Sequence, residues 1–341
     1  MIKLIDWFCT INGTLCAKEH LPYTMKKKLL FLFNPQAGKG AIRDYLLDII
    51  TTFSDAGYDL SVQTTQHSGH LPEIIAEKAK DFDLLVTSGG DGTLNETING
   101  LLHSRLTMPV GYIAAGTIND FATTLRLSKH MPQAAKDIVN GTAFPCDVGV
   151  FQNRYFSYVA AFGAFTDVAY QTPQNTKNLL GKAAYVLEAI GRLPTLKTYR
   201  MRFEYDDQVI EDEFLYGMVS NSITVGGMPL NKNRSVSMND GLLEVLLIKK
   251  PTFPFDVEAA LNSLQTLEGD SPFFYSFKVN QLRVVTLDET NVPWTLDGEY
   301  GGDDRDITIG VIPSALNILV PNEPALAYTA ELPLETGPEK T

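Results

Sequence analysis

The sequence predicts an α/β domain built on a parallel sheet, followed by a mostly antiparallel, sandwich-like β domain. In the first part of the chain, short apolar runs alternate with glycine-bearing loops and amphipathic segments, which is typical of strands wound into a parallel sheet. Beyond residue 142, β-rich segments are separated by turn signals such as Asn239-Asp240-Gly241, which favours antiparallel strands. A length of 341 residues also suits two domains, because single cores stop growing at about 250–300 residues.

The first domain is expected to contain four strands and at least two helices. Leu29–Phe33 is a continuous apolar run, as in a strand that is buried on both faces. The next strand shows alternation of apolar and polar residues instead. The strands are expected at residues 29–33, 58–62, 83–88 and 109–114, and the helices at residues 42–53, before the C-cap residue Gly57, and 94–102.

The second part of the chain has shorter β-rich segments and two helical patches. The strands are expected at residues 154–161, 199–205, 214–220, 242–248, 281–287 and 307–312, and the helices near residues 177–191 and 255–268. We therefore divide the chain into an N-terminal extension (1–24), the α/β domain (25–142), the β domain (143–304) and a disordered tail (322–341). Residues 305–321 contain the last strand, and we leave open whether they join the α/β domain.

Charge and cysteine content limit the function classes. A net charge of −12 disfavours nucleic-acid binding, and it also disfavours tight docking on anionic membranes. No apolar run approaches the ~20 residues of a membrane helix, and the N-terminus lacks a signal-peptide pattern. Cys9, Cys16 and Cys146 form no CxxC pair and have no histidine at ligand spacing, so no zinc site is expected. A reducing, cytoplasmic compartment is the natural interpretation.

The histidines give no functional signal in the sequence. The chain has five of them, including His67 and His70 in a polar stretch. They show no partner arrangement, and none is assigned a role.

The segment Gly89–Glu96, with the sequence GGDGTLNE, is the sharpest functional signal. It follows a buried strand and opens a helix, so its glycines allow a tight turn and its helix N-terminus suits a phosphate. Asp91 would repel a bare anion, which favours a magnesium-bound nucleotide. The loop is no dinucleotide fingerprint, because Asn95 stands where the third glycine should be. The earlier Gly38-Lys39 pair is no Walker A motif either, because Gly40 follows it.

Two more polar loops follow strands of the same predicted sheet. Asn34–Gly40 comes after the first strand, and Gly116–Phe121 comes after a later one. Each could be a plain turn on its own, because Asn-Pro and Gly-Thr are common in turns. The carboxyl ends of parallel strands meet at one edge, so we expect the three loops to converge on one crevice.

Taken together, the motifs NPxxGKG, GGDGTLNE and GTxNDF resemble the diacylglycerol kinase catalytic domain family, as found in soluble bacterial lipid kinases. The resemblance also covers Asp240-Gly241 and Leu296–Tyr300, and thus extends from about Lys26 to Pro321. The GGDGT motif alone is shared with NAD kinases and phosphofructokinases.

The resemblance implies ATP and Mg²⁺ as cofactors and assigns residues to them. Asp120 would lie near the nucleotide as a second carboxylate. A structural Mg²⁺ would bind the Asp240 carboxylate and the main-chain carbonyls of Ser237 and Leu242. Residues of all three loops and one further strand end would bind ATP: Asn34, Pro35, Gln36, Ala37, Gly38, Thr65, Gly90, Asp91, Gly92, Thr93, Leu94, Asn95, Glu96 and Thr117.

Glu299 would be the general base that accepts the proton of a lipid hydroxyl. From the residues alone, Asp297-Gly298-Glu299 is an ordinary turn, and so is Asn239-Asp240-Gly241. Phosphoryl transfer does require a carboxylate within reach of the attacking hydroxyl.

The implied activity is ATP-dependent phosphorylation of diacylglycerol to phosphatidic acid, with transient contact to the membrane surface during catalysis. Other lipid alcohols (phosphatidylglycerol, undecaprenol and sphingoid bases) remain open as acceptors, and so does a homodimer. A more remote alternative is an NAD-kinase-like enzyme, which the Asn34–Gly40 loop disfavours. A catalytically silent nucleotide-binding regulator is the third alternative, which the intact Asp91 and Glu299 disfavour.

Overall fold

The structure is a computed structural model that describes residues 26–163, 197–222, 224–225, 228–229, 237–250 and 271–322. The predicted N-terminal extension and the predicted helices near residues 177–191 and 255–268 lie outside the described residues, as does nearly all of the predicted tail.

The four predicted strands of the first domain are confirmed. They are β1 (Lys28–Phe33), β2 (Asp59–Thr64), β3 (Leu84–Gly89) and β4 (Pro109–Ala114). They form a parallel sheet in the order β4-β3-β1-β2. Crossover connections between parallel strands place helices over the two faces of such a sheet.

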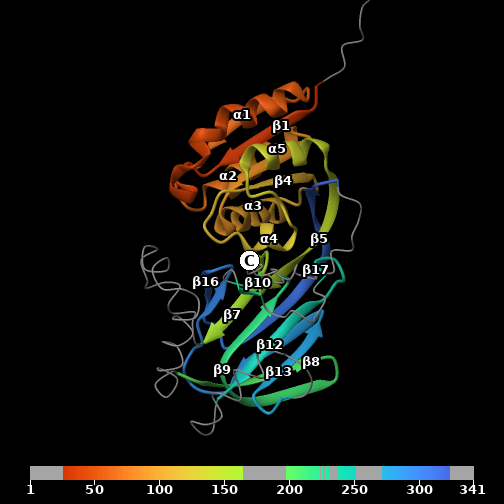
Figure 1. The fold of residues 1–341 in the computed structure, drawn as a ribbon. Coiled ribbons are helices and arrows are strands. Elements are labelled where there is room, and N and C mark those ends of the chain that lie inside the picture. The colour runs from red at the N-terminus through yellow and green to blue at the C-terminus, as the bar shows by residue number, and fades with distance from the viewer. Residues whose placement is uncertain are drawn as a thin grey trace, which may run out of the picture.

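Helices cover both faces of this sheet (Figure 1). On one face, α1 (Ile42–Asp55) packs beside α5 (Met131–Asn140), and on the other α2 (His70–Lys78) packs beside α3 (Asp91–His103). Alternate residues of β1 feed the two cores: Leu29 and Phe31 pack with α1, whereas Leu30 and Leu32 pack with α3. The continuous apolar run of β1 is thus explained by burial on both faces.

Three helical segments of this domain were not predicted: α2, α5 and the short α4 (Asp120–Thr124). The sequence of α2 does carry a helical pattern, because Leu71, Ile74 and Ile75 are all buried on one face. The helix begins after Gly69, which adopts a left-handed conformation with φ of 82°.

The second part of the chain consists of antiparallel strands, as predicted, and its own core is formed by a second cluster of aliphatic and aromatic side chains. Two residue pairs, β10 (Thr224–Val225) and β11 (Met228–Pro229), form a small separate ladder. The other strands are β5 (Thr142–Phe151), β6 (Arg154–Phe156), β7 (Val159–Gly163), β8 (Tyr199–Tyr205), β9 (Gln208–Ser220), β12 (Leu243–Lys249), β13 (Phe274–Val279), β14 (Gln281–Thr286), β15 (Trp294–Leu296), β16 (Glu299–Gly302) and β17 (Asp306–Val320).

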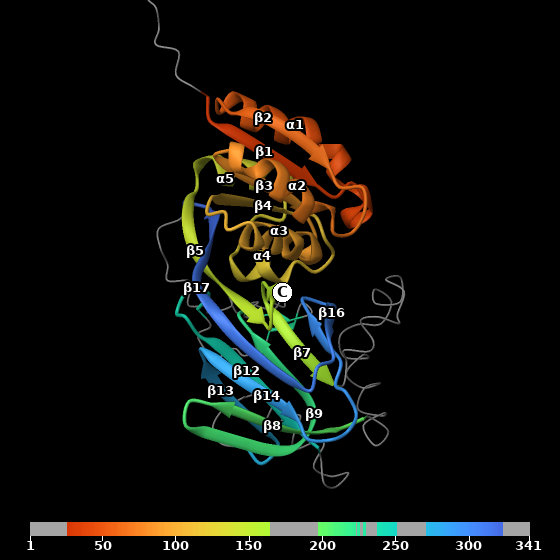
Figure 2. The same cartoon turned by 180° about the vertical axis from the view of Figure 1, so that it is seen from behind.

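Strand β17 connects the two parts of the molecule (Figure 2). It pairs antiparallel with β14 and β5, and its last residues pair parallel with β4, at Asn317–Pro109 and Ile318–Val110. The hydrogen-bonded sheet is therefore continuous from one domain into the other.

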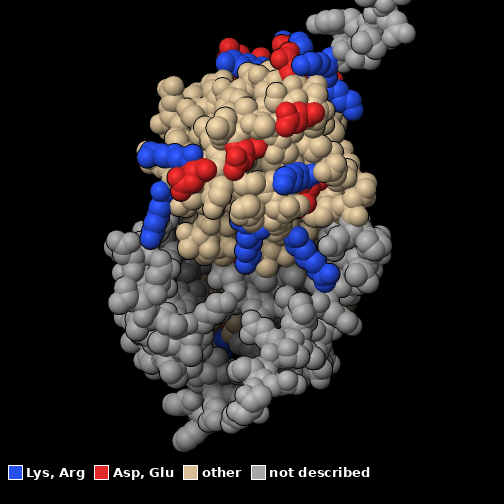
Figure 3. Space-filling model, turned by 45° about the horizontal axis from the view of Figure 1, so that its top comes forward, with Lys and Arg blue, Asp and Glu red and all other residues tan. Residues whose placement is uncertain are grey.

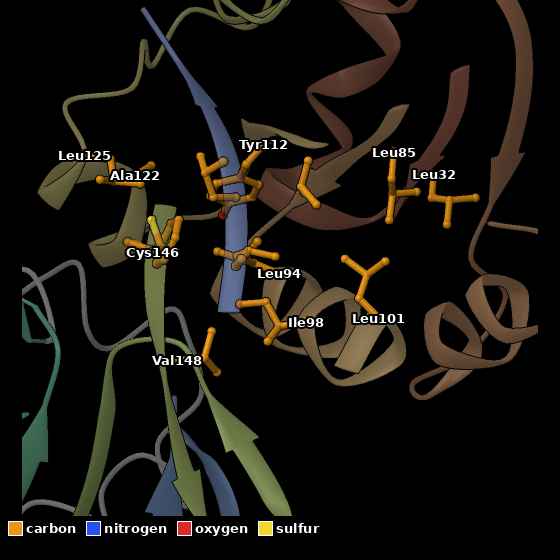
Figure 4. Packing of buried hydrophobic residues seen from close by; sticks show 14 of the residues in the cluster. Leu32, Leu85, Leu94, Ile98, Leu101, Tyr112, Ala122, Leu125, Cys146 and Val148 are labelled. Carbon is orange, nitrogen blue, oxygen red and sulfur yellow. The ribbon is translucent and has the colours of Figure 1, made fainter. Parts of the chain in front are cut away.

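A shared hydrophobic cluster covers this junction (Figure 4). Cys146 and Val148 of β5 belong to the same cluster as Leu94 and Ile98 of α3 and Ile318 of β17. Helix α3, which begins at Asp91, is thus packed against the strands that lead into the β domain. None of the helices in the described part of the chain is long and apolar enough to cross a bilayer.

Candidate active site

Three strand ends of the parallel sheet lie side by side and carry the three glycine-bearing loops. The backbone N–H of Asn34 donates to the carbonyl of Ser88 at 2.9 Å, and the N–H of Ala115 donates to the carbonyl of Gly89 at 2.8 Å. The loop after β1 is thus tied to the end of β3, and the end of β3 to the loop after β4. Thr65 joins the same edge, because its N–H donates to Phe33 at 2.9 Å.

The loops approach one another more closely than side chains would allow. A Cβ atom on Gly38, which has φ of +55°, would lie 2.0 Å from the carbonyl oxygen of Ala115. A Cβ atom on Gly116 would lie 2.6 Å from Cα of Gly90. Glycine is therefore needed at Gly38 for both space and backbone conformation. The predicted convergence of the three loops is therefore present in the structure.

The loop after β1 is shaped by its own residues. The Asn34 Oδ1 atom accepts a hydrogen bond from the N–H of Gln36 at 2.9 Å, which closes a tight Asx turn. Gly38 and Lys39 then both adopt left-handed backbone angles, with φ of 55° and 62°. Lys39 is exposed at the tip of this loop.

The first turn of α3 offers an anion site made of backbone. Its N-cap, Gly90, is extended and supplies no side-chain cap. Uncapped N–H groups at the start of a helix suit a phosphate. The side chains that follow point elsewhere, because Thr93 and Leu94 are buried, with 8% and 0% exposure. If these two residues contact a nucleotide, the contact is therefore through backbone.

Asp91 lies in a buried, electronegative position. Its Oδ2 atom accepts the N–H of Asn119 at 3.0 Å, and the N–H of Asp120 also donates to it. Burial first, and then the charges of Asp120 and Asp297, raise the pKa of Asp91 to about 6. Within the described residues, its buried Oδ1 atom has no hydrogen-bond partner. A carboxylate oxygen in this state fits a hydrated magnesium ion or a donor on a ligand.

The loop after β4 is closed by Asn119. Its Oδ1 atom accepts the N–H of Gly116 at 3.0 Å, and its Nδ2 atom donates to the carbonyl of Gly116 at 2.8 Å. Asn119 itself has φ of 56°. The predicted nucleotide contact, Thr117, is exposed between these two residues. Asn119 therefore fixes the shape of the loop on which Thr117 is exposed.

Asp297 links the two domains and was regarded in the sequence only as a turn residue. Its Oδ2 atom accepts from Asn95 Nδ2 at 2.7 Å and from the N–H and Oγ of Ser157 at 2.6 and 2.8 Å. Its Oδ1 atom accepts the N–H groups of Tyr158 and Val159, both at 3.0 Å. Burial raises the pKa of Asp297, and the N–H donors of residues 157–159 oppose this effect.

These bonds also explain a wrong expectation. Residues 154–161 were expected to form one strand, but β6 ends at Phe156 and β7 begins at Val159. The N–H groups of Ser157 and Tyr158 bond to the Asp297 carboxylate instead of a neighbouring strand. A carboxylate 140 residues away in the chain thus interrupts the strand.

A two-residue hairpin places Glu299 beside the Gly90–Gly92 turn. Asp297 and Gly298 both have positive φ, of 51° and 87°, and Leu296 of β15 pairs with Glu299 of β16. Such a turn is typical of tight antiparallel hairpins. A Cβ atom on Gly92 would lie 3.9 Å from Glu299 Oε1. The carboxylate of the β domain therefore lies directly beside the glycine loop of the α/β domain.

The comparisons with known proteins agree with this geometry. Residues 28–151 match the family model described as the diacylglycerol kinase catalytic domain. Residues 160–320 match the model described as the YegS C-terminal NAD kinase beta sandwich-like domain. A protein named diacylglycerol kinase from Bacillus subtilis (strain 168) is 32% identical over 280 residues, which cover 81% of this chain and 91% of that protein.

The chain belongs to the diacylglycerol kinase family. A diacylglycerol kinase from Staphylococcus epidermidis is 31% identical over 283 residues, covering 82% of this chain and 87% of that protein. The crystal structure of a putative diacylglycerol kinase from Bacillus anthracis str. Sterne has a TM-score of 0.73 and 27% identity, and it covers 88% of this chain and 98% of that one. The family resemblance of the motifs is confirmed, and the family supports a lipid kinase.

In this diacylglycerol kinase family member, the predicted magnesium loop lies on the β domain. Asp240 accepts the N–H of Leu242 through Oδ1 at 3.1 Å and the ammonium of Lys278 through Oδ2 at 3.0 Å. Ser237 Oγ bonds to the Asn239 side chain. Carboxylate and main-chain oxygens are the type of ligand that Mg²⁺ prefers, so the residues of this loop fit the ion.

Two side chains of the Gly89–Glu96 segment, those of Asn95 and Glu96, form hydrogen bonds with neighbouring parts of the fold. Asn95 reaches the β domain, where its Nδ2 atom also donates to the carbonyl of Tyr155 at 3.1 Å. The Oε1 atom of Glu96 accepts the N–H of Gly69 at 2.8 Å and the hydroxyl of Ser68 at 3.2 Å. These side chains therefore connect the start of α3 to the β domain and to the turn after β2.

Proposed function

We propose that this lipid kinase transfers the γ-phosphate of ATP to the hydroxyl of diacylglycerol, giving phosphatidic acid. The observation that carries the proposal is the position of the Glu299 carboxylate, whose Oε1 atom lies 3.9 Å from a Cβ position on Gly92. This brings a carboxylate from one domain to the phosphate-binding loop of the other. Family membership and the name of the Bacillus subtilis relative support diacylglycerol as the acceptor.

In the proposed mechanism, the loops at the sheet edge hold the triphosphate. Backbone N–H groups at the start of α3 would bind phosphate oxygens, and Gly38 and Gly90 would let the backbone come close to them. Mg²⁺ would neutralise the charge of the phosphates during transfer. Asp91 is the residue best placed to hold this Mg²⁺, because its Oδ1 atom has no hydrogen-bond partner in the described part of the chain.

Glu299 would act as the general base. It would accept the proton of the lipid hydroxyl as the oxygen attacks the γ-phosphorus and ADP leaves. Its exposure at the start of β16 leaves room for an acceptor to approach. Asp297 would hold the hairpin, and thereby Glu299, against α3 through Asn95.

The acceptor lies in a bilayer, so we infer that the enzyme acts peripherally at a membrane surface from the cytoplasm. Figure 3 shows Lys and Arg side chains projecting from the lower edge of the first domain. Such side chains favour local contact with anionic headgroups even on a chain of net charge −12.

The test is transfer of labelled phosphate from ATP to a panel of lipid alcohols in mixed micelles and, in a parallel reaction, to NAD. Diacylglycerol is expected to be labelled far more strongly than phosphatidylglycerol, undecaprenol or sphingosine. Labelling of another lipid alone would replace the acceptor and leave the kinase assignment intact. Labelling of NAD with no labelled lipid would overturn the proposal.

A matched pair of variants tests the base. Glu299→Gln is expected to lower kcat by about 10²–10⁴-fold, the usual contribution of a general base, with little change in ATP affinity. Glu289→Gln removes an exposed glutamate of the same domain and serves as the control. Equal activities in the two variants would exclude Glu299 as the base.

A further inference from the structure

The structure brings together three side chains of types that can bind metals and that have no role in the proposed function. His67 lies in the turn after β2, and His70 and Glu73 lie in the first turn of α2. One potential ligand atom from each residue lies within 4.8 Å of the other two. The two imidazole rings are stacked, with centroids 4.7 Å apart and an angle of 23° between their planes.

The local backbone explains why these residues meet. They are spaced three residues apart, as His-x-x-His-x-x-Glu, which places His70 and Glu73 on one face of α2. His67 precedes the helix, and Gly69, with φ of 82°, turns the chain so that the His67 ring stacks on His70. This arrangement depends on a helix that was not predicted.

We propose that His67, His70 and Glu73 bind a divalent transition-metal ion of the zinc type. Two imidazoles and one carboxylate are ligands that Zn²⁺ accepts, and three protein ligands leave one position for water. Magnesium prefers an all-oxygen set, so this site is chemically different from the magnesium sites of the proposed reaction. The expectation that the chain has no zinc site was based on the cysteines, which form no CxxC pair and have no histidine at ligand spacing. The proposed site contains no cysteine.

The site requires only a small adjustment. Zinc bonds of about 2.0–2.2 Å place tetrahedral ligand atoms roughly 3.3–3.5 Å apart, whereas the present atoms lie within 4.8 Å. His67 and Glu73 are exposed, so their side chains can rotate toward a shared ion. Among the described residues, the ion pairs do not involve Glu73, which leaves its carboxylate available.

Hydrogen bonds indicate which ring atoms would bind the ion. His67 Nδ1 lies 3.0 Å from the carbonyl of Ser68, so it carries the proton and leaves the Nε2 lone pair for a metal. His70 Nδ1 lies 3.1 Å from the N–H of Gln66 and accepts from it. Coordination through His70 therefore exchanges this exposed hydrogen bond for a metal bond at Nδ1, and water can satisfy the released N–H.

The turn that carries the site is anchored to the candidate active site. The residues between the two histidines, Ser68 and Gly69, both donate to Glu96 in the first turns of α3. This anchoring fixes the backbone of the turn between the two histidines before any ion binds. An ion at this site would in turn fix the position of Glu96.

Isothermal titration calorimetry of the tag-free, full-length protein with zinc chloride tests the proposal. We expect saturable binding at a site that millimolar Mg²⁺ does not compete for. Zinc affinity is expected to fall more than about tenfold in His67→Ala and in His70→Ala, because each loses a ligand. Glu73→Gln is expected to weaken it as well.

His103→Ala is the matched control, because His103 is also an exposed histidine near a helix end, on α3. Its zinc affinity should equal that of the unmodified chain, and circular dichroism should show all variants folded. Absence of zinc binding by the unmodified chain would overturn the proposal. Equal affinity in a folded His67→Ala/His70→Ala double variant would also overturn it. Neither result bears on lipid phosphorylation, which is measured separately.

Discussion

Replacing Asp297 with asparagine should destabilise the protein strongly and misplace Glu299. Asp297 is 5% exposed, and its two oxygens accept five hydrogen bonds of 2.6–3.0 Å. Asparagine keeps one oxygen but puts an NH₂ group where the other stood. If that group takes the Oδ1 position, the N–H groups of Tyr158 and Val159 lose their acceptor.

The expected magnitude follows from these lost bonds. A hydrogen bond to a charged group contributes about 1.5–3 kcal/mol, so losing two of them lowers the free energy of unfolding by about 4 kcal/mol. For 341 residues, an unfolding entropy of about 2.1 cal/mol/K per residue converts this into a fall in Tm of roughly 6 °C.

Differential scanning fluorimetry checks the stability, and steady-state kinetics checks the function. Asp207→Asn, in the exposed turn between β8 and β9, is the control and should change Tm by less than about 2 °C. Because Asp297 acts through the hairpin, Asp297→Asn should lower kcat more than it raises KM for ATP. A Tm within 2 °C of the control would refute the role assigned to this carboxylate.

Three further changes have defined outcomes. The pKa of Asp91 is raised to about 6, so the contribution of its protonated carboxyl group to folding stability is complete below pH ~4 and is lost as pH rises through about 6. Asp91→Asn should therefore stabilise the nucleotide-free protein by about 2–3 kcal/mol at pH 8 and hardly at all at pH 4. Equal Tm differences between the variant and the unmodified chain at both pH values would contradict this. Gly38→Ala would place a Cβ atom 2.0 Å from the Ala115 carbonyl oxygen, so ATP affinity measured by calorimetry should fall at least about tenfold. Unchanged affinity would show that close contact between the loops after β1 and β4 is not required for ATP binding. Mg²⁺ should raise Tm by a few degrees in the unmodified chain and by much less in Asp240→Ala; an identical rise in both would remove the magnesium role of that loop.

The parallel strands could be predicted because burial on both faces requires uninterrupted apolar runs. Leu29–Phe33 is such a run, and β1 occupies these residues with one more before them. Helix α2 was missed because it has nine residues, with a proline at its third position and polar residues before it. It packs against α3, and such a tertiary contact cannot be read from a local sequence pattern.

The glycine loops could also be predicted, because close approach of two backbones limits the residue choice at Gly38 and Gly116. The partners of Asp297 could not, because they come from residues 95 and 157–159, far away in the chain. The sequence offers only Asp-Gly at that place, which is equally typical of a solvent-exposed turn. The meeting of His67 with His70 likewise depended on the turn at Gly69.

The continuity of β17 affects how the enzyme can admit a substrate. Enzymes that close a cleft by rotating two domains need a hinge of a few residues that can change their backbone angles. Here the crossing strand pairs with β14 and β5 before residue 313, and with β5 and β4 again from Leu316. A bulge interrupts the ladder between Ile312 and Leu316, and rotation there would still break the sheet hydrogen bonds on either side of it. We therefore expect substrates to enter and leave through movement of short surface segments, while the angle between the two domains stays nearly constant.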